Sequence, residues 1–141
     1  MQTVATLYDR IGIPLSLTEA GGVQSEDLPS FVRKHLVAAR LWHLVAWRDG
    51  PSDMFGLWHK GRAVAFERSC LANLSIQAAT PARGPGWIAL MVRVVDQPIS
   101  TELLGMRGFR QETYEWLLSQ SPVLEQLSGT TVSIAGAYPD V

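Results

Sequence analysis

The spacing of apolar residues predicts a helix and then three strands in the first half of the chain. Apolar residues recur at helical intervals from Leu28 to Ala39, behind Ser25 or Asp27 as the helix cap. The next segments are rich in aromatic and branched residues and are separated by turn residues. The predicted strands are 41–48, 54–60 and 62–68. Because only short turns join them, we expect an antiparallel three-stranded meander.

The second half alternates between strand and helix patterns, and the first 20 residues stay ambiguous. Residues 2–20 fit a helix near Leu7 and a short strand over 14–18. Further strands are expected at 74–78, 87–95 and 130–138, and helices at 100–106, 109–120 and 121–129. This order predicts a single α+β domain over 1–141, with a mainly antiparallel sheet of about five to six strands. Its central meander would be packed by the N-terminal-half helix and by the C-terminal helices.

A five-residue loop after Arg48 determines which side chains share a face of the meander. It would pair Arg48 with Met54 and His43 with His59. One face would then carry Leu41, His43, Val45, Trp47, Phe55, Leu57, His59, Arg62, Val64 and Phe66, and the other Trp42, Leu44, Ala46, Met54, Gly56 and Trp58. Both faces are apolar, so we expect a helix on one and a second helix, another subunit or a ligand on the other.

The composition is that of a folded domain. Hydrophobic residues make up 47% of the chain and charged residues 18%, which excludes a disordered tail. The single cysteine, Cys70, excludes an internal disulfide. We find neither a signal peptide nor an apolar run long enough for a membrane span, and therefore expect a cytoplasmic protein without a membrane partner. The net charge of −1 argues against nucleic acid as a partner.

The charges are polarised along the chain. Between Arg33 and Arg68 there are seven basic and three acidic residues, a net of +4, whereas Asp96 to Val141 holds two basic and six acidic residues, a net of −4. The two segments can neutralise each other within one molecule. Alternatively, the basic segment attracts an acidic partner, an anionic ligand or a second copy of the chain.

The predicted meander supplies a candidate ligand site. His43, His59 and Arg62 would form a polar corner, in which Arg62 binds a carboxylate or phosphate. Trp47, Phe55 and Phe66 would supply an apolar wall. The alternative is that these side chains pack or reach water at a sheet edge.

Other candidates rest on fewer observations. The chain has five tryptophans, and Trp42 and Trp58, together with Arg83 in the loop 80–86, could contact a partner or simply pack and connect. Two histidines across the meander lack any metal-ligand spacing, so we predict no metal and no cofactor. Cys70 could be a nucleophile or a small buried side chain, and we assign no catalytic residue.

We expect a non-enzymatic binding or regulatory domain that associates with itself as a homodimer or with a partner protein. The alternative is a small-molecule-binding domain, or a small lyase or isomerase, with an apolar pocket that recognises an aromatic or acyl carboxylate.

Overall fold

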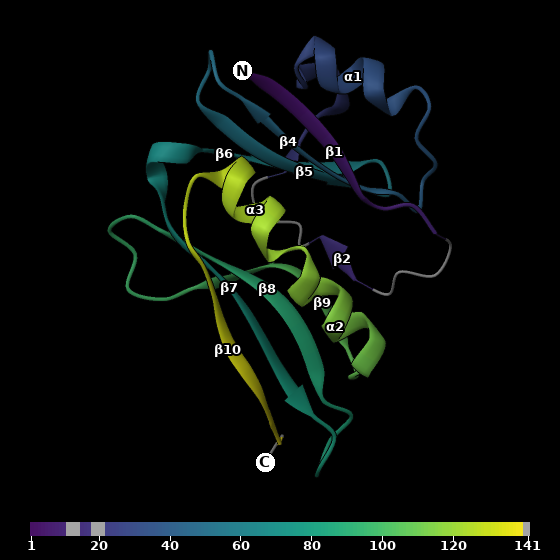
Figure 1. Ribbon diagram of the computed structural model, residues 1–141, viewed down its shortest axis with the longest axis vertical. Helices are drawn as coiled ribbons and strands as arrows, with labels where there is room; N and C mark the ends of the chain where they lie inside the picture. Colours follow the sequence, from purple (N-terminus) through teal and green to yellow (C-terminus); the bar gives the residue numbers. More distant parts are fainter. Residues whose placement is uncertain (11–14, 18–21, 140–141) are drawn as a thin grey trace.

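Two five-stranded sheets form the framework of the computed structural model, which describes residues 1–10, 15–17 and 22–139 (Figure 1). The first sheet has the order β1 (Gln2–Tyr8), β4 (Leu44–Asp49), β5 (Met54–His59), β6 (Arg62–Glu67) and β3 (Gly22–Val23). The second has the order β10 (Val132–Pro139), β7 (Leu71–Thr80), β8 (Trp87–Val94), β9 (Thr101–Arg107) and β2 (Ser16–Leu17). The described strands pair antiparallel except β10 with β7. The predicted α+β class and the mainly antiparallel pairing are therefore confirmed, but the strands form two sheets where one was predicted.

The helices occupy two different layers. The helical elements are η1 (Ser25–Asp27), α1 (Ser30–Leu36), η2 (Arg68–Cys70), α2 (Gln111–Ser119) and α3 (Ser121–Ser128). In Figure 1, α1 lies over the outer side of the first sheet, and α2 and α3 lie on the side where the two sheets face each other. The predicted start of α3 at Ser121-Pro122 and its end at Gly129 are confirmed, with Gly129 in the left-handed conformation that closes helices.

The main core lies between the two sheets. It joins the inner face of the first sheet, for example Phe55 and Leu57, to the inner face of the second, for example Ile76 and Leu90. A smaller core lies under η1 and α1 on the outer face of the first sheet. Its buried members are Leu28, Val32, Val45, Trp47, Trp58 and Ala63. Elements of this chain thus pack on both apolar faces of the meander.

The meander of β4, β5 and β6 is confirmed, but the predicted register of its first hairpin is wrong by one residue. Asp49, not Arg48, pairs with Met54, so the loop has four residues. The carboxylate of Asp49 accepts hydrogen bonds from Ser52 Oγ at 2.8 Å and Gln2 Nε2 at 3.3 Å. These bonds favour Asp49 as the strand end. The predicted register of the second hairpin, with His59 opposite Arg62, is confirmed.

The one-residue correction moves every β4 side chain to the other face. Trp47 pairs with Gly56 instead of Phe55 and lies on the outer face, while Leu44 and Ala46 point into the main core. A Cβ at Gly56 would collide with the Trp47 ring. Glycine at position 56 therefore lets a large indole lie flat across the neighbouring strand.

Four further expectations need correction. The segment predicted as a helix over 100–106 is strand β9, because its apolar residues pair with β8 instead of lining a helix face. The N-terminal helix is shorter than predicted and ends at Leu36. Residues Gln2–Tyr8 form a strand, and the described strands number ten instead of about five to six. The ambiguous residues 11–14 and 18–21 lie outside the described part of the chain.

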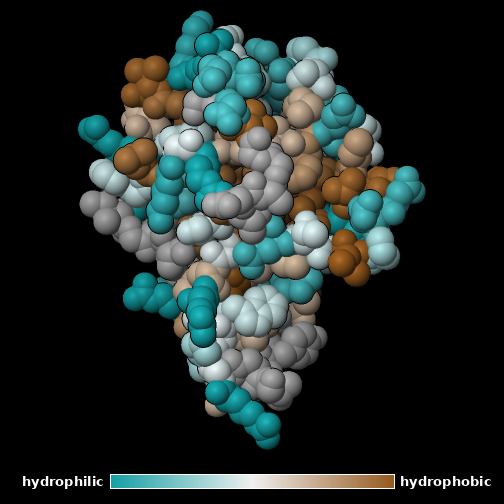
Figure 2. Space-filling model, turned by 180° about the vertical axis from the view of Figure 1, so that it is seen from behind, coloured by the Kyte–Doolittle hydropathy of each residue, from teal (hydrophilic) through white to brown (hydrophobic). Residues whose placement is uncertain are grey.

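Few large apolar side chains reach the surface of the described structure. The large apolar residues that are more than a third exposed are Met1, Val37, Leu41, Trp87, Val95, Ile99 and Ile134. In the view from behind, hydrophobic surface forms separate patches within a mainly polar surface (Figure 2). Within the described residues, no helix has the length and apolarity that a membrane crossing requires.

Candidate functional site

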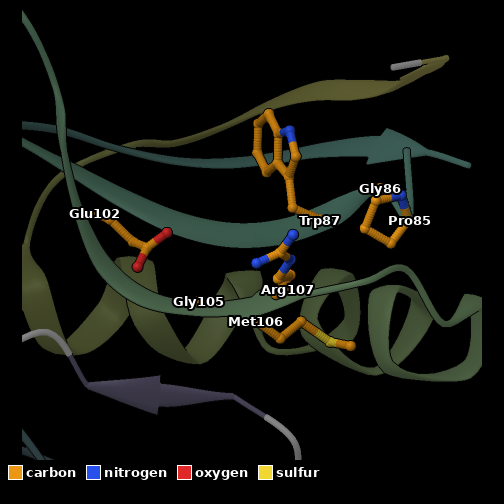
Figure 3. Close-up of a pocket in the computed structure, with 7 residues that line it drawn as sticks. All are labelled: Pro85, Gly86, Trp87, Glu102, Gly105, Met106 and Arg107. Carbon is orange, nitrogen blue, oxygen red and sulfur yellow. The ribbon is translucent and has the colours of Figure 1, made fainter. Parts of the chain in front are cut away.

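A pocket of about 470 Å³ lies over β8 and β9 of the second sheet, next to the end of the preceding loop. Its lining consists of Pro85, Gly86, Trp87, Glu102, Gly105, Met106 and Arg107. Its volume lies within the range of small-molecule sites. In Figure 3, the Trp87 indole stands on β8 beside the Arg107 side chain, and Glu102 lies further along β9. The pocket thus offers one flat aromatic surface and two opposite charges.

The strand register brings these groups to one face. Trp87 lies directly opposite Arg107, and Ala89 lies opposite Gly105. Ala89 is 1% exposed, so small residues form the floor between the larger side chains. Successive side chains of a strand point to opposite faces, so Ile88 and Leu90, on either side of Ala89, point into the main core.

A β-bulge in β9 turns Glu102 toward the same face. The register shifts between the pairs Leu90–Leu104 and Met91–Glu102, so Leu103 is an extra residue. Because of this insertion, Glu102 and Gly105 share a face although they are three residues apart. The Glu102 carboxylate lies so close over Gly105 that a Cβ there would collide with it. Glycine at 105 therefore makes room for the acidic wall of the pocket.

The end of the loop before β8 is fixed to the far end of β9. Gly108 N donates to Gly86 O at 2.9 Å, and Phe109 N donates to Pro85 O at 3.1 Å. Gly86 has φ +77°, and a Cβ there would collide with the carbonyl oxygen of Ala79. A side chain at position 86 would not fit so close to Ala79. Glycine at this position therefore allows the backbone conformation that places Pro85 at the pocket.

The lining chemistry suits binding of an anionic group with a flat apolar part. Arg107 is exposed and forms no ion pair with another described residue. Its guanidinium can donate two parallel hydrogen bonds to a carboxylate. Trp87 is 40% exposed beside it, and an exposed indole offers a stacking surface with a large contact area. The described lining contains no serine, cysteine or histidine that could act as a nucleophile or shuttle a proton.

The structure brings only part of the predicted ligand site on the meander together. Phe55 lies opposite Phe66, and His59 lies opposite Arg62. Phe55 and His59 are buried in the main core, and Phe66 is half-buried against it. Arg62 is exposed at the end of β6. Trp47 lies on the opposite face under α1, because the hairpin register differs from the predicted one. His43 precedes β4 and pairs with no residue of β5; its ring lies edge-on to Trp42 at 6.2 Å.

His59 is held inside the protein as a neutral side chain. It is 2% exposed, and its Nδ1 donates to the carbonyl oxygen of His43 at 3.0 Å. Burial lowers the pKa of His59 below its ordinary value of 6.5, although the hydrogen bond to His43 opposes that change. The contact between these two histidines is therefore between a ring and a backbone oxygen, and it stabilises the entry into β4.

The three predicted interface residues lie in different places. Trp58 is 7% exposed under α1, and Trp42 is partly exposed before β4. Arg83 is exposed in the loop that leads to the pocket. Cys70 is exposed in η2, so its expected role as a buried side chain is wrong. Its Sγ lies 3.7 Å from Oε2 of Glu67.

Sequence reasoning missed the β8–β9 pocket because it predicted a helix over 100–106. On a helix, Glu102 and Arg107 would not lie opposite β8. The available signal was Gly105, since glycine inside an apolar segment indicates a close approach better than a helix interior. The described residues contain no group of three His, Cys, Asp or Glu side chains arranged to hold a metal ion.

No protein-family model matches the chain, and neither a curated protein nor a solved structure is significantly similar to it.

Proposed function

We propose that the protein is a non-enzymatic binding domain and that its β8–β9 pocket takes a small aromatic or acyl carboxylate. The observation that carries this proposal is the pair of Trp87 and Arg107, which lie directly opposite each other above a floor of small residues. Arg107 binds the carboxylate, and the apolar part of the ligand stacks on the indole. Glu102 excludes a second negative group from the other end of the pocket and favours ligands with one acidic group.

Calorimetric titration with benzoate and with benzamide tests the role of the charge. The two molecules share a ring, but only benzoate carries the anionic group that Arg107 would bind. We expect benzoate to bind at least about tenfold more tightly, a difference of about 1.4 kcal/mol. Equal affinities for the two molecules would remove the carboxylate from the proposal.

Variants then assign the affinity to the pocket. Arg107→Gln should abolish the preference for benzoate. Trp87→Ala should lower the affinity for both molecules, because the stacking surface is lost. Arg110→Gln is the matched control, since Arg110 is also exposed but lies outside the pocket lining. Benzoate binding that survives Arg107→Gln would place the ligand elsewhere.

A second candidate function is homodimer formation through β10. This strand is at the edge of the second sheet and pairs only with β7 among the described strands. Residues 132–138 carry no charge, and Ile134 is 53% exposed. An uncharged edge strand is a template for pairing with another chain. The register shift after Ile134 and Gly136 with φ +81° restrict such pairing to the first half of β10.

Sedimentation velocity over a range of concentrations tests this candidate. We expect a dimer that Ile134→Lys converts to a monomer, because a lysine on an edge strand opposes strand addition. Ile99→Lys is the matched control, since Ile99 is 70% exposed but lies outside any strand. A monomer at every concentration would exclude the homodimer.

A further inference from the structure

A groove of about 430 Å³ lies on the outer side of the first sheet, between α1 and the β5–β6 hairpin. Leu28, Leu36, Val37 and Trp58 form its apolar wall, and Gly61 marks the hairpin end. This groove is separate from the β8–β9 pocket, which belongs to the second sheet. The groove and the pocket share no lining residue.

One exposed apolar side chain lines this groove, and another lies near it. Val37 lines the groove and is 87% exposed, and Leu41, which is not a lining residue, is 67% exposed. Lys60 N donates to Leu41 O at 3.1 Å, which holds Leu41 beside the hairpin turn at Gly61. In the view from behind, hydrophobic surface is visible at the upper left, the end of the molecule that carries α1 (Figure 2). Exposed apolar residues next to an apolar groove are typical of a docking surface.

Basic side chains surround the groove. Arg33 lines it together with Glu26, and three further basic residues are next to lining residues in the sequence: Lys34, Lys60 and Arg62. None of these four basic residues forms an ion pair with another described residue. Two acids, Glu26 and Asp27, lie in η1, so these six residues carry four positive and two negative charges, a net of +2.

Among the described residues, the acids of α2 and α3 do not neutralise this surface by direct contact. One ion pair among the described residues joins Arg68 to Asp53 at 3.1 Å, and both belong to the basic segment 33–68. The acids of α2 and α3, among them Glu112 and Glu115, are exposed and pair with no described basic residue. The basic surface therefore keeps its charge available for a partner.

We propose that this groove binds an amphipathic helix of a partner protein, with acidic residues on both sides of its apolar stripe. The stripe would contact Val37, Leu41 and the wall around Trp58, and its acids would lie against Arg33 and Lys60. Helices bind hydrophobic grooves through apolar residues spaced three and four apart, and opposite charges at the rim set specificity and association rate. A second copy of this chain fits less well, because the exposed residues of α2 and α3 are polar apart from Pro122 and form no apolar stripe.

Two synthetic peptides of about 14 residues, roughly four helical turns, test the proposal. Both carry leucine at helical spacing; one has glutamate at the flanking positions and the other has lysine. Binding of fluorescein-labelled peptide is followed by anisotropy. We expect saturable binding of the acidic peptide, at least about tenfold tighter than that of the basic peptide, and a loss of affinity as salt increases. The proposal is overturned if the acidic peptide fails to bind at about 1 mM.

Variants locate the binding on the groove. Val37→Glu and Lys60→Glu should each lower the affinity for the acidic peptide by about tenfold. Both residues are exposed, so the fold should tolerate the change. Ile99→Glu is the matched control, because Ile99 is a similarly exposed apolar residue in the β8–β9 connection. Unchanged affinity after Val37→Glu, confirmed by an unchanged far-ultraviolet circular dichroism spectrum, would contradict the proposal.

Two further measurements separate this partner from other occupants. Co-sedimentation with phosphatidylcholine vesicles containing about 30% phosphatidylserine should show no Val37-dependent binding. Sedimentation velocity should show no Val37-dependent dimer. If Val37→Glu abolishes binding to the vesicles, the groove binds a lipid surface and not a partner helix. If Val37→Glu abolishes a dimer, the groove binds a second copy of the chain.

Discussion

The outer faces of the two sheets differ in what covers them. On the first sheet, large residues such as Trp47 and Trp58 are buried under α1. On the second sheet, the outer face carries small and polar residues such as Ser75 and Ala89, and neither apolar cluster includes a residue of this face. A helix needs large apolar side chains to pack against. Besides Trp87 and Met91, the second face carries mostly small or polar side chains, so it stays open enough for a pocket to form beside Trp87.

The first prediction tests how closely the covered face is packed. Gly56→Val should lower the free energy of unfolding by about 3 kcal/mol or more, because the new side chain would collide with Trp47 and displace α1. Urea denaturation measures the loss. Ala135→Val is the control on an exposed strand position. A change within about 1 kcal/mol would show that the Trp47 ring has another place to pack.

The second prediction compares the two outer faces directly. Val45→Ala removes a fully buried side chain under α1 and should cost about 2 kcal/mol of unfolding free energy. Met91→Ala removes a larger but partly exposed side chain from the other outer face and should cost less than about 1 kcal/mol. Thermal and urea unfolding of both variants measure the difference. Equal losses would mean that the second face is covered as well as the first.

The third prediction concerns the helical layer between the sheets. Gly129 ends α3 with φ +74°, and a Cβ there would collide with the guanidinium of Arg68. Arg68 Nε in turn donates to Ser128 O at 3.2 Å, which ties the end of α3 to the end of the meander. Gly129→Ala should therefore cost about 1 to 2 kcal/mol. Gly61→Ala is the control, because Gly61 has a similar φ of +76° and open space around it. Equal losses in the two variants would show that the Arg68 contact adds nothing to the backbone strain.

The fourth and smallest effect is a pH dependence that arises in the main core. The pKa of His59 is lowered by burial, so below about pH 6.5 the unfolded chain binds a proton that the folded protein does not. The free energy of unfolding should therefore fall as the pH decreases below 6.5, until the pH reaches the folded-state pKa. His59→Gln should reduce this slope in urea denaturation at several pH values. An unchanged slope would assign the pH dependence to other groups.

The site was harder to predict than the fold because two local patterns were ambiguous. Residues Leu103, Leu104 and Met106 fit a helix face and a bulged strand equally well. The segment forms a strand because it pairs with β8, and the bulge in that strand places Glu102 beside Gly105. Likewise, turn residues at 49–53 indicate a hairpin but do not determine its register, which here depends on the hydrogen bonds of Asp49.

The sequence by itself determined the strands and helices with strong local signals: the meander, the proline and glycine that bound α3, and the α+β class. Periodicity and turn residues act over a few neighbours, so they can be recognised in one segment at a time. The tertiary structure decided which sheet each strand joined, which faces were covered, and where Trp87 met Arg107. Those outcomes depend on contacts between residues far apart in the chain, and a sequence pattern specifies the surfaces that pack but not their partners.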